Sequence, residues 1–314
     1  MRAVRGDDGA PRLVDLDEPP GPHDGEVVTM RAVGICASDL MYLRFGTDRV
    51  LGHELAGVRA DGTAVALEGL FGCGRCAHCI SGRNNLCAEA PGKALGIGQD
   101  GGLTERYRHP SHKLVPLPSR LDVRDASLVE PASVAWHGVR RGAVDGQTRV
   151  AVVGGGSIGQ LAAAAARAQG AVDVALEARH PHQHEIRERL GFDQPSATYD
   201  VVIESAGSPS AIQRSVQLAR PGGTIVVLGV ADGPLDVPFR DLLTKELTVK
   251  ASMGYCGHPG RREMAEAAQL LADRPEIAEA LITHRFPIED APEAFRVAAD
   301  RSSGAVKVVI DINS

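Results

Sequence analysis

The pattern of apolar and polar residues changes near residue 130. Before that point, short β-type runs at residues 26–30 and 63–67 alternate with segments rich in glycine and proline, without long helical periodicity. This pattern predicts an irregular, β-rich domain.

From about residue 135, apolar strands alternate with amphipathic or alanine-rich helical segments. Strands are predicted at residues 149–153, 172–176, 200–203, 224–228 and 305–310, and helices at residues 160–169, 184–190, 211–218 and 261–271. Gly170 and Gly191 are expected to end the first two of these helices. Strands joined by crossover helices predict a parallel, doubly wound sheet, so the fold class is α/β.

Composition excludes several classes of partner. The net charge of −6 argues against a nucleic-acid surface, which needs a basic excess or stripe. No window approaches the roughly 20 apolar residues of a membrane span. The first residues lack the apolar core of a secretory signal, so we expect a cytoplasmic protein.

Four of the six cysteines fall within 15 residues, in the pattern C-x2-C-x2-C-x7-C. They are Cys73, Cys76, Cys79 and Cys87. Four thiolates suit a tetrahedral zinc ion and leave no open position, so the pattern predicts a structural Zn²⁺ site. An iron–sulfur cluster stays open as an alternative because its cysteine spacings overlap.

A glycine-rich turn joins the predicted strand at residues 149–153 to the following helix. Its sequence is Gly154-Gly155-Gly156-Ser157-Ile158-Gly159, which contains the G-x-G-x-x-G pattern. The first glycine of that pattern permits the tight turn, the second lets a pyrophosphate approach, and the third lets helix pack on strand. Free N–H groups at the helix start then hold the phosphate charge, which indicates a dinucleotide site.

The second strand of this fold usually ends with an acid that binds the ribose 2′-OH of NAD. Here that position falls on Ala178, followed by Arg179 and His180. A guanidinium in place of the acid favours a 2′-phosphate, hence NADP(H) over NAD(H). Glu177 lies one residue earlier, and a shift of one residue would restore the NAD interpretation.

Two short segments complete the pattern: residues 34–39 (GICASD) and residues 52–57 (GHELAG). Taken alone, Cys36 is typical of a buried thiol and His53 of a hydrogen-bonded polar residue. Together with the cysteine group and the glycine turn, they resemble the zinc-containing medium-chain dehydrogenase/reductase family, of the alcohol, sorbitol and threonine dehydrogenase type. The resemblance extends through residues 200–207 (DVVIESAG), 220–223 (RPGG), 245–247 (KEL) and 304–309 (GAVKVV).

The resemblance implies a GroES-like catalytic domain at residues 1–132 and 255–314, and a Rossmann nucleotide domain at residues 133–254. It implies that Cys36 and His53 bind a catalytic Zn²⁺, with Glu130 or Glu54 as the third ligand. We favour Glu130, with Glu54 close enough to exchange. Asp39 resembles the carboxylate that orients the histidine, and Ser38 the hydroxyl that passes the proton of the alcohol outward.

The implied reaction moves a hydride between NAD(P) and a small alcohol, polyol, sugar or cyclitol, or the matching ketone or aldehyde. A zinc ion lowers the pKa of the bound alcohol. The implied cofactor-binding residues are Gly154, Gly156, Ser157, Ile158, Gly159, Ala178, Arg179, His180, Ala206 and Gly229. A homodimer or homotetramer joined through an edge strand at residues 247–252 is also implied.

The chain departs from the family at two places. Relatives usually have a histidine proton relay five residues after the zinc cysteine, where this chain has Met41. The segment from Gly57 to Cys73 is unusually short for this family, which predicts a trimmed β-barrel and a more open substrate cleft. The expected lining of that cleft is Ser38, Met41, Phe45, His53, Glu130 and Trp136, with Trp136 at the start of a helix over residues 136–140.

Two other interpretations of function remain. One is a quinone or enone reductase of the same fold without catalytic metal, against which Cys36, His53 and Glu130 together argue. The other is a non-enzymatic nucleotide-binding protein. His180, His182 and His184 resemble a metal tract, but we expect them to be solvated histidines in the loop around the adenosine ribose.

Overall fold

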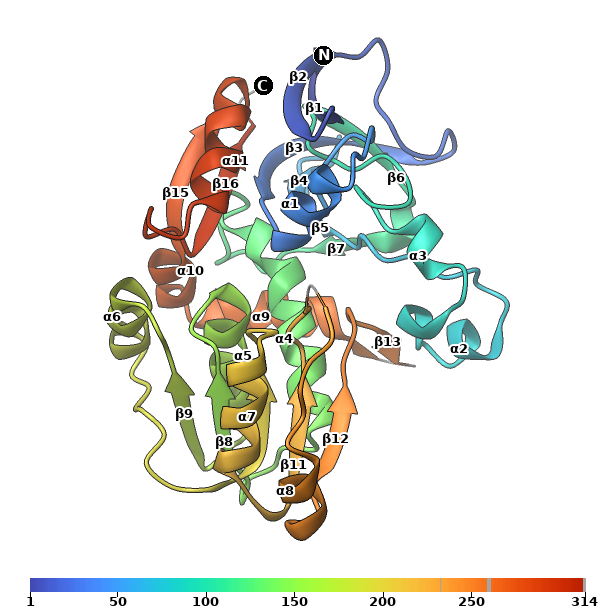
Figure 1. Cartoon of the computed structure of the whole chain (residues 1–314). Helices are drawn as coiled ribbons and strands as arrows, with labels where there is room; N and C mark the ends of the chain where they lie inside the picture. Colours follow the sequence, from blue (N-terminus) through green and yellow to red (C-terminus); the bar gives the residue numbers. More distant parts are fainter. Residues whose placement is uncertain (232, 259–260, 313–314) are drawn as a thin grey trace. The chain divides into compact units, whose positions relative to one another are not determined.

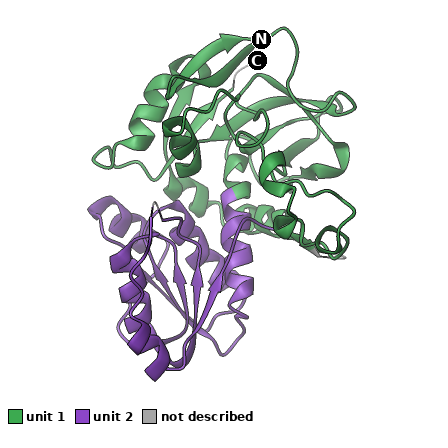
Figure 2. Cartoon of the chain, turned by 45° about the vertical axis from the view of Figure 1, so that its right-hand side comes forward, with its two compact units in different colours: residues 1–130, 256–314 green, residues 131–255 purple. Residues whose placement is uncertain are grey.

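The computed structural model of the chain describes residues 1–231, 233–258 and 261–312. The chain folds into two compact units, shown in green and purple in Figure 2. Unit 1 comprises Met1–Glu130 and Cys256–Ser314, and unit 2 comprises Pro131–Tyr255.

Unit 1 is built around a mixed sheet of seven strands. The strand order is β15-β16-β3-β4-β5-β7, and β6 pairs with β3. Their bounds are β3 (Glu26–Gly34), β4 (Glu54–Val58), β5 (Ala64–Leu67), β6 (Arg106–His109), β7 (Leu114–Pro116), β15 (Ile282–Pro287) and β16 (Lys307–Asp311). Only β15 and β16 pair in parallel, so the sheet is antiparallel elsewhere.

Short hairpins and helices complete unit 1. The hairpins are β1 (Arg2–Asp7) with β2 (Ala10–Asp15), and β13 (Gly257–His258) with β14 (Arg261–Arg262). The helices are α1 (Ala37–Arg44), α2 (Ala77–Ile80), α3 (Ala90–Lys93), α9 (Glu263–Asp273), α10 (Glu276–Leu281) and α11 (Ala291–Ala299). Val33, Leu55, Leu67 and Ile310 have no exposed surface and belong to the core, against which Phe295 of α11 packs.

Unit 2 contains a parallel sheet of five strands in the order β12-β11-β10-β8-β9 (Figure 1). The strands are β8 (Arg149–Val153), β9 (Asp173–Glu177), β10 (Tyr199–Glu204), β11 (Ala219–Val227) and β12 (Thr248–Ala251). The helices are α4 (Val129–Arg141, two residues of which precede the unit), α5 (Ser157–Ala168), α6 (Pro181–Arg189), α7 (Pro209–Leu218) and α8 (Phe239–Thr244). This confirms the predicted fold class, a β-rich domain plus a doubly wound parallel sheet.

Both glycines predicted to end helices do so. Gly170 follows α5 with φ of 103°, and Gly191 follows α6 with φ of 70°. An L side chain is disfavoured in this left-handed region, so glycine is the natural residue after a helix end.

Several sequence-based boundaries were wrong. Trp136 lies in the middle of α4, because Pro131 is tolerated in the first turn of a helix that begins at Val129. The strand predicted at residues 224–228 begins earlier, at Ala219. The helix predicted from residue 261 begins at Glu263, since Arg261 and Arg262 pair with β13 instead.

The three histidines after β9 are also placed differently. Pro181 starts α6, and proline suits the first helical position because its φ is already helical. His180 is therefore the N-cap residue, and His182 and His184 lie on the helix, not in a loop. Across the described residues, no helix is both long enough and apolar enough to span a membrane.

Candidate active site and metal centres

Cys36, His53 and Glu54 meet because β3 and β4 pair in antiparallel register. Gly34, the last residue of β3, is the partner of Glu54, the first residue of β4. Cys36 follows two residues after the strand end, and His53 directly precedes Glu54. One ligand atom from each of Cys36, His53 and Glu54 lies within 4.8 Å of the other two. The sheet register thus brings together residues 17 positions apart in sequence.

Asp39 fixes the orientation of this group. It is 1% exposed, and its Oδ2 accepts a hydrogen bond from the backbone N–H of Cys36 at 2.9 Å. Its Oδ1 lies 3.3 Å from Nδ1 of His53, so the imidazole presents Nε2 to the thiol side. Ser38 Oγ lies 3.3 Å from that Nε2. This is the arrangement in which a carboxylate positions a metal-binding histidine.

The charges around His53 favour its protonated form when no cation is near. Burial alone lowers the pKa of the imidazole, but the charge and hydrogen bond of Asp39, with a smaller contribution from Cys36, raise that pKa well above its ordinary value. The group combines a half-buried thiol with a buried imidazole and a buried carboxylate. Zn²⁺ accepts these donor types, so the residues fit a zinc ion.

Lys307 is a site residue that the sequence analysis did not assign. Its Nζ lies 2.7 and 2.8 Å from the two carboxylate oxygens of Glu54 and donates a hydrogen bond to the carbonyl of Ile35 at 3.2 Å. The Lys307 side chain is 4% exposed and that of Glu54 is 1% exposed. Glu54 therefore already has a buried cationic partner. A lysine inside the otherwise apolar run at residues 305–310 is the only signal in the sequence.

Glu130, in the first turn of α4, is the other candidate carboxylate. The group with mutual separations within 4.8 Å includes Glu54 but not Glu130. Burial, and then the neighbouring carboxylate of Glu54, raise the pKa of Glu130 to about 7, against the opposing effect of His53. Glu130 is thus close enough for the charges of Glu54 and His53 to change its pKa.

The four clustered cysteines form a second group, also with ligand atoms within 4.8 Å of one another. All are free thiols. The backbone N–H groups of Arg75 and Cys76 lower the pKa of Cys73 to about 6. Gly72 makes room for the group, because a Cβ at this position would lie 2.3 Å from the sulfur of Cys79. Four convergent thiols with N–H···S hydrogen bonds fit a structural zinc ion.

The glycine turn of unit 2 has the three properties that a nucleotide-binding turn needs. Gly154 has φ of 121°. A Cβ at Gly156 would have no neighbour within 4 Å, so the backbone is open to an approaching phosphate. A Cβ at Gly159 would lie 1.7 Å from the carbonyl oxygen of Gly154, so only glycine fits at this position in the first turn of α5. These residues fit a dinucleotide.

The loops that follow β10 and β11 contact this turn and each other. The Ser205 hydroxyl donates to the carbonyls of Val153 and Gly154 at 3.1 and 3.2 Å. Oε1 of Glu204, a residue with no exposed surface, accepts from the N–H groups of Ala206 and Gly207 at 2.8 and 2.7 Å. A Cβ at Gly229 would lie 2.5 Å from the other oxygen of Glu204. The predicted residues Ala206 and Gly229 therefore lie on loops held by one buried carboxylate.

The end of β9 shows which side chain faces the turn. β9 ends at Glu177, whose Oε2 lies 2.6 Å from Nε of Arg214 on α7. The Cβ of Ala178 lies 2.6 Å from the position that a Cβ of Gly155 would take. Ala178 therefore faces the glycine turn, and Arg179, which follows it, is exposed.

Comparison with known proteins identifies the family of the chain. The family model for a zinc-binding dehydrogenase matches residues 157–273, and that for an alcohol dehydrogenase GroES-like domain matches residues 23–119. The L-galactonate-5-dehydrogenase of Escherichia coli is 30% identical, with 93% of this chain and 94% of that protein covered. The chain belongs to the zinc-containing medium-chain dehydrogenase/reductase family.

Two further relatives are similar over most of their length. The L-arabinitol 4-dehydrogenase of Aureobasidium melanogenum is 32% identical, with 91% of this chain and 87% of that protein covered. The crystal structure of a zinc-binding dehydrogenase from Sinorhizobium meliloti bound to NADP is 28% identical, with a TM-score of 0.87 and coverage of 99% and 98%.

Membership of this family confirms that the protein is an enzyme. It is a zinc-dependent oxidoreductase that acts on alcohols and uses NAD(P). The non-enzymatic interpretation is therefore wrong. Zinc and a nicotinamide nucleotide are its cofactors.

Proposed function

We propose that the chain interconverts a small secondary polyol or sugar alcohol and the matching ketone, with NADP(H) as the preferred nucleotide. The observation that carries this proposal is the convergence of Cys36, His53 and Glu54, with Asp39 behind the histidine. The substrate class rests on relatives that are named for polyol and sugar-acid dehydrogenation.

In this proposal Cys36, His53 and one carboxylate hold the catalytic zinc. When bound, the zinc supplies a Lewis acid that makes the alcohol more acidic, and the nucleotide takes up the hydride. Asp39 keeps the imidazole in the orientation that presents Nε2. Ser38 Oγ, 3.3 Å from that nitrogen, receives the proton of the alcohol and passes it outward. Because Met41 replaces the usual histidine relay, the proton continues to water from Ser38.

The choice of carboxylate follows from the charges. Glu54 is held on both oxygens by Lys307, which favours its remaining there. Burial and the neighbouring carboxylate of Glu54 raise the pKa of Glu130 to about 7, and a bound cation would offset both effects. We therefore assign Glu130 as the resident ligand and Glu54 as the group that exchanges with it.

The preference for NADP(H) rests on the residues around Ala178. The acid that would bind a ribose 2′-OH is absent at the position facing the glycine turn, and Glu177 is engaged by Arg214. The exposed Arg179 and the N-terminus of α6 both favour a negatively charged 2′-phosphate.

We further propose a homodimer or homotetramer joined through β12. This strand is at the edge of the parallel sheet, and Val249 on it is 50% exposed. Phe239 and Leu243 of α8, the helix before it, are 72% and 67% exposed. An open strand edge next to exposed apolar side chains supports pairing with a second copy.

Metal analysis and turnover test the proposal together. We expect two zinc ions per chain and NADPH-dependent reduction of ketoses in a panel of carbonyl compounds. Cys36→Ala should leave one zinc ion per chain and abolish turnover, yet leave NADPH binding by fluorescence unchanged. A single zinc ion in the fully metal-loaded native protein, or undiminished turnover by Cys36→Ala, would show that the metal chemistry assigned here is wrong.

Nucleotide preference is tested separately. Arg179→Ala should weaken NADP binding about tenfold and leave NAD binding nearly unchanged, because only NADP carries the 2′-phosphate. Arg240→Ala, an exposed arginine on α8 of the same unit, is the control. Equal effects of Arg179→Ala on both nucleotides would refute the role.

A further inference from the structure

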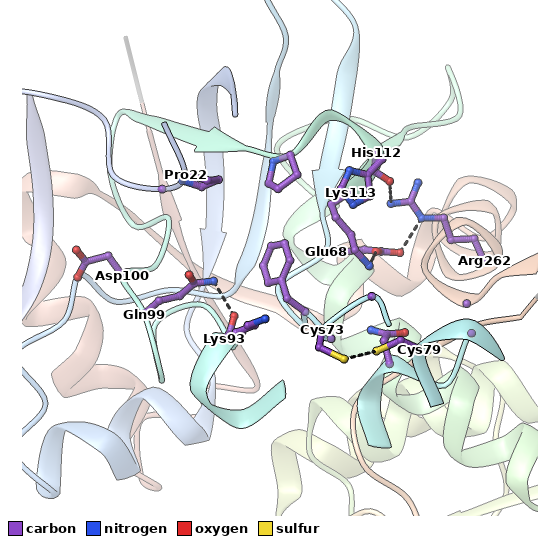
Figure 3. Close-up of a pocket in the computed structure, with 18 of the residues that line it drawn as sticks. Pro22, Glu68, Cys73, Cys79, Lys93, Gln99, Asp100, His112, Lys113 and Arg262 are labelled. Carbon is purple, nitrogen blue, oxygen red and sulfur yellow. Dashed lines mark hydrogen bonds and ion pairs between the residues drawn. The ribbon is translucent and has the colours of Figure 1, made fainter. Parts of the chain in front are cut away.

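Unit 1 contains a large cavity that does not include the Cys36–His53 group. Its volume is about 1120 Å³, and its lining runs from Glu68 and Phe71, just after β5, to Lys113 and to β13 and β14 (Figure 3). Ligand cavities in proteins commonly measure about 300–1,000 Å³, so this one has room for a metabolite-sized molecule.

One side of the cavity carries an excess of positive charge. Glu68 lies 2.9 Å from Nζ of Lys113 and 2.7 Å from Nε of Arg262, so one carboxylate serves two cations. Figure 3 shows these three side chains gathered together beside His112. Burial acts against ionisation of the carboxyl, but the two cations lower the pKa of Glu68 below its ordinary value. The Glu68 carboxyl is therefore ionised near neutral pH.

Arg261 adds a further cation to the same lining. Its side chain is exposed, and among the described residues it has no acidic partner. The whole lining carries five cationic side chains and two carboxylates, in a protein whose net charge is −6. The cations are Arg49, Lys93, Lys113, Arg261 and Arg262, and the carboxylates are Glu68 and Asp100. Such a local reversal of sign concentrates anions from solution.

The lining also offers an apolar surface. The ring of Phe71 packs edge-on against His109 with centroids 5.4 Å apart, and Nζ of Lys113 lies 6.0 Å from the Phe71 centroid. His109 has no exposed surface, and burial lowers its pKa to about 3, so it is neutral. Phe71 therefore presents an uncharged wall next to the cations.

The four-cysteine group borders the cavity through Cys73 and Cys79, which Figure 3 shows below the Glu68 cluster. Four thiolates with one Zn²⁺ carry a negative charge, so an anion is repelled from that edge. Lys93, on the lining near it, is already paired with Glu89 at 2.9 Å. Both facts leave Arg261, Lys113 and Arg262 as the positions at which an anion is stabilised.

We propose that this cavity is a second ligand site, separate from the active site, which binds a small anion whose phosphate or carboxylate group contacts Arg261 and Lys113 and whose carbon skeleton packs on Phe71. Arginine and lysine are the residues proteins use for such groups. Lys113 has two N–H groups beyond the one that meets Glu68, so it can bind an anion without losing its partner.

Titration calorimetry at low ionic strength tests the site. NADPH, or NADH in a separate titration, is present in excess so that the glycine turn is already occupied. Phenyl phosphate is the phosphate probe and phthalate the carboxylate probe, with sodium chloride at equal ionic strength as the control for screening. We expect saturable binding of one molecule per chain. Heats that match the chloride control at every concentration would overturn the proposal.

Variants locate the binding. Arg261→Gln should weaken binding of the preferred probe about fivefold, and the double variant Arg261→Gln/Lys113→Gln at least about tenfold. Arg106→Gln, an exposed arginine of unit 1 outside the lining, should change nothing. An equal loss in Arg106→Gln, or none in the double variant with native circular dichroism, would contradict the assignment.

A last comparison separates this site from the active site. Binding should persist in Cys36→Ala, because no group that holds the catalytic metal lines the cavity. Loss of binding in Cys36→Ala would mean that the anion sits on the catalytic zinc, and the proposal would be wrong. The assay needs no turnover, so its failure is distinguishable from failure of the proposed function.

Discussion

Lys307→Met tests whether the ion pair behind the active site holds unit 1 together. The variant removes the cationic partner of Glu54, whose side chain is 1% exposed, and keeps an unbranched side chain of similar length. Removing one member of a buried ion pair destabilises proteins by about 3–5 kcal/mol, because the remaining charge is buried without compensation.

Protonation sets an upper limit on this loss. A glutamic acid in water has a pKa of about 4.3, and each pH unit corresponds to about 1.36 kcal/mol, so taking up a proton at pH 7.5 costs about 4.4 kcal/mol. The same step costs about 1.6 kcal/mol at pH 5.5. In the variant the folded state then binds more protons than the unfolded state, so its stability rises as the pH falls from 7.5 to 5.5.

Hydrogen exchange at increasing urea concentration is followed on peptides that cover β4 and β16. It measures the free energy of unfolding of the seven-stranded sheet of unit 1 separately from that of unit 2. Zinc is first removed with a chelator, so that no metal replaces the lysine. We expect Lys307→Met to lose about 3–4 kcal/mol at pH 7.5 and less than half of that at pH 5.5. Glu54→Gln/Lys307→Met, which buries no charge, should recover most of the loss.

Lys93→Met is the matched control. Lys93 and Glu89 are 2.9 Å apart, against 2.7 Å for Lys307 and Glu54, but the side chains of Lys93 and Glu89 are 42% and 41% exposed. Surface pairs contribute at most about 1 kcal/mol. If Lys307→Met cost no more than Lys93→Met, or if its loss were the same at both pH values, the buried pair would not stabilise the barrel as described.

Three further predictions concern the other features of the chain. Cys76→Ser should lower the zinc content by one ion per chain and lower the Tm, without changing NADPH affinity; unchanged zinc by mass spectrometry would argue against a four-thiolate site. Ala178→Asp should shift the ratio of NAD to NADP affinities at least about tenfold toward NAD, because an acid facing the turn binds a 2′-OH and repels a 2′-phosphate; a constant ratio would remove Ala178 from the nucleotide site. Val249→Lys should lower the molar mass in light scattering by placing like charges on a shared strand edge, and an unchanged mass would place the interface elsewhere.

The candidate site residues could be proposed from the sequence because each is part of a local pattern. The glycine turn needs its glycines for φ and space, and the cysteine spacing fits a tetrahedral ion, so both could be identified without the fold. The role of Lys307 could not be, because it depends on the pairing of Val309 with Gly34, far away in sequence. A lysine in a strand normally indicates a solvent-facing position, and only this pairing buries it beside Glu54.

The second strand of unit 2 shows the same limit. Sequence alone left open whether Glu177 or Ala178 faces the glycine turn, because a one-residue difference reverses the side chains. The contact of Ala178 with Gly155 and the ion pair of Glu177 with Arg214 distinguish the two. Helix starts were missed where a proline stood inside the first turn, as at Pro131 and Pro181, since proline elsewhere ends helices.

The turn between β4 and β5 lies within residues 57–73, the segment that the resemblance indicates is short, and the hairpin of these strands starts beside the proposed metal ligands. β4 begins at Glu54 and ends at Val58, where a turn over residues 59–63, closed by a hydrogen bond from Arg59 N–H to the Thr63 carbonyl, returns the chain to β5. His53 and Glu54 stand at the start of β4, at the opposite end of the strand from this turn. A change in the length of this turn would therefore leave the start of β4, and with it His53 and Glu54, in place.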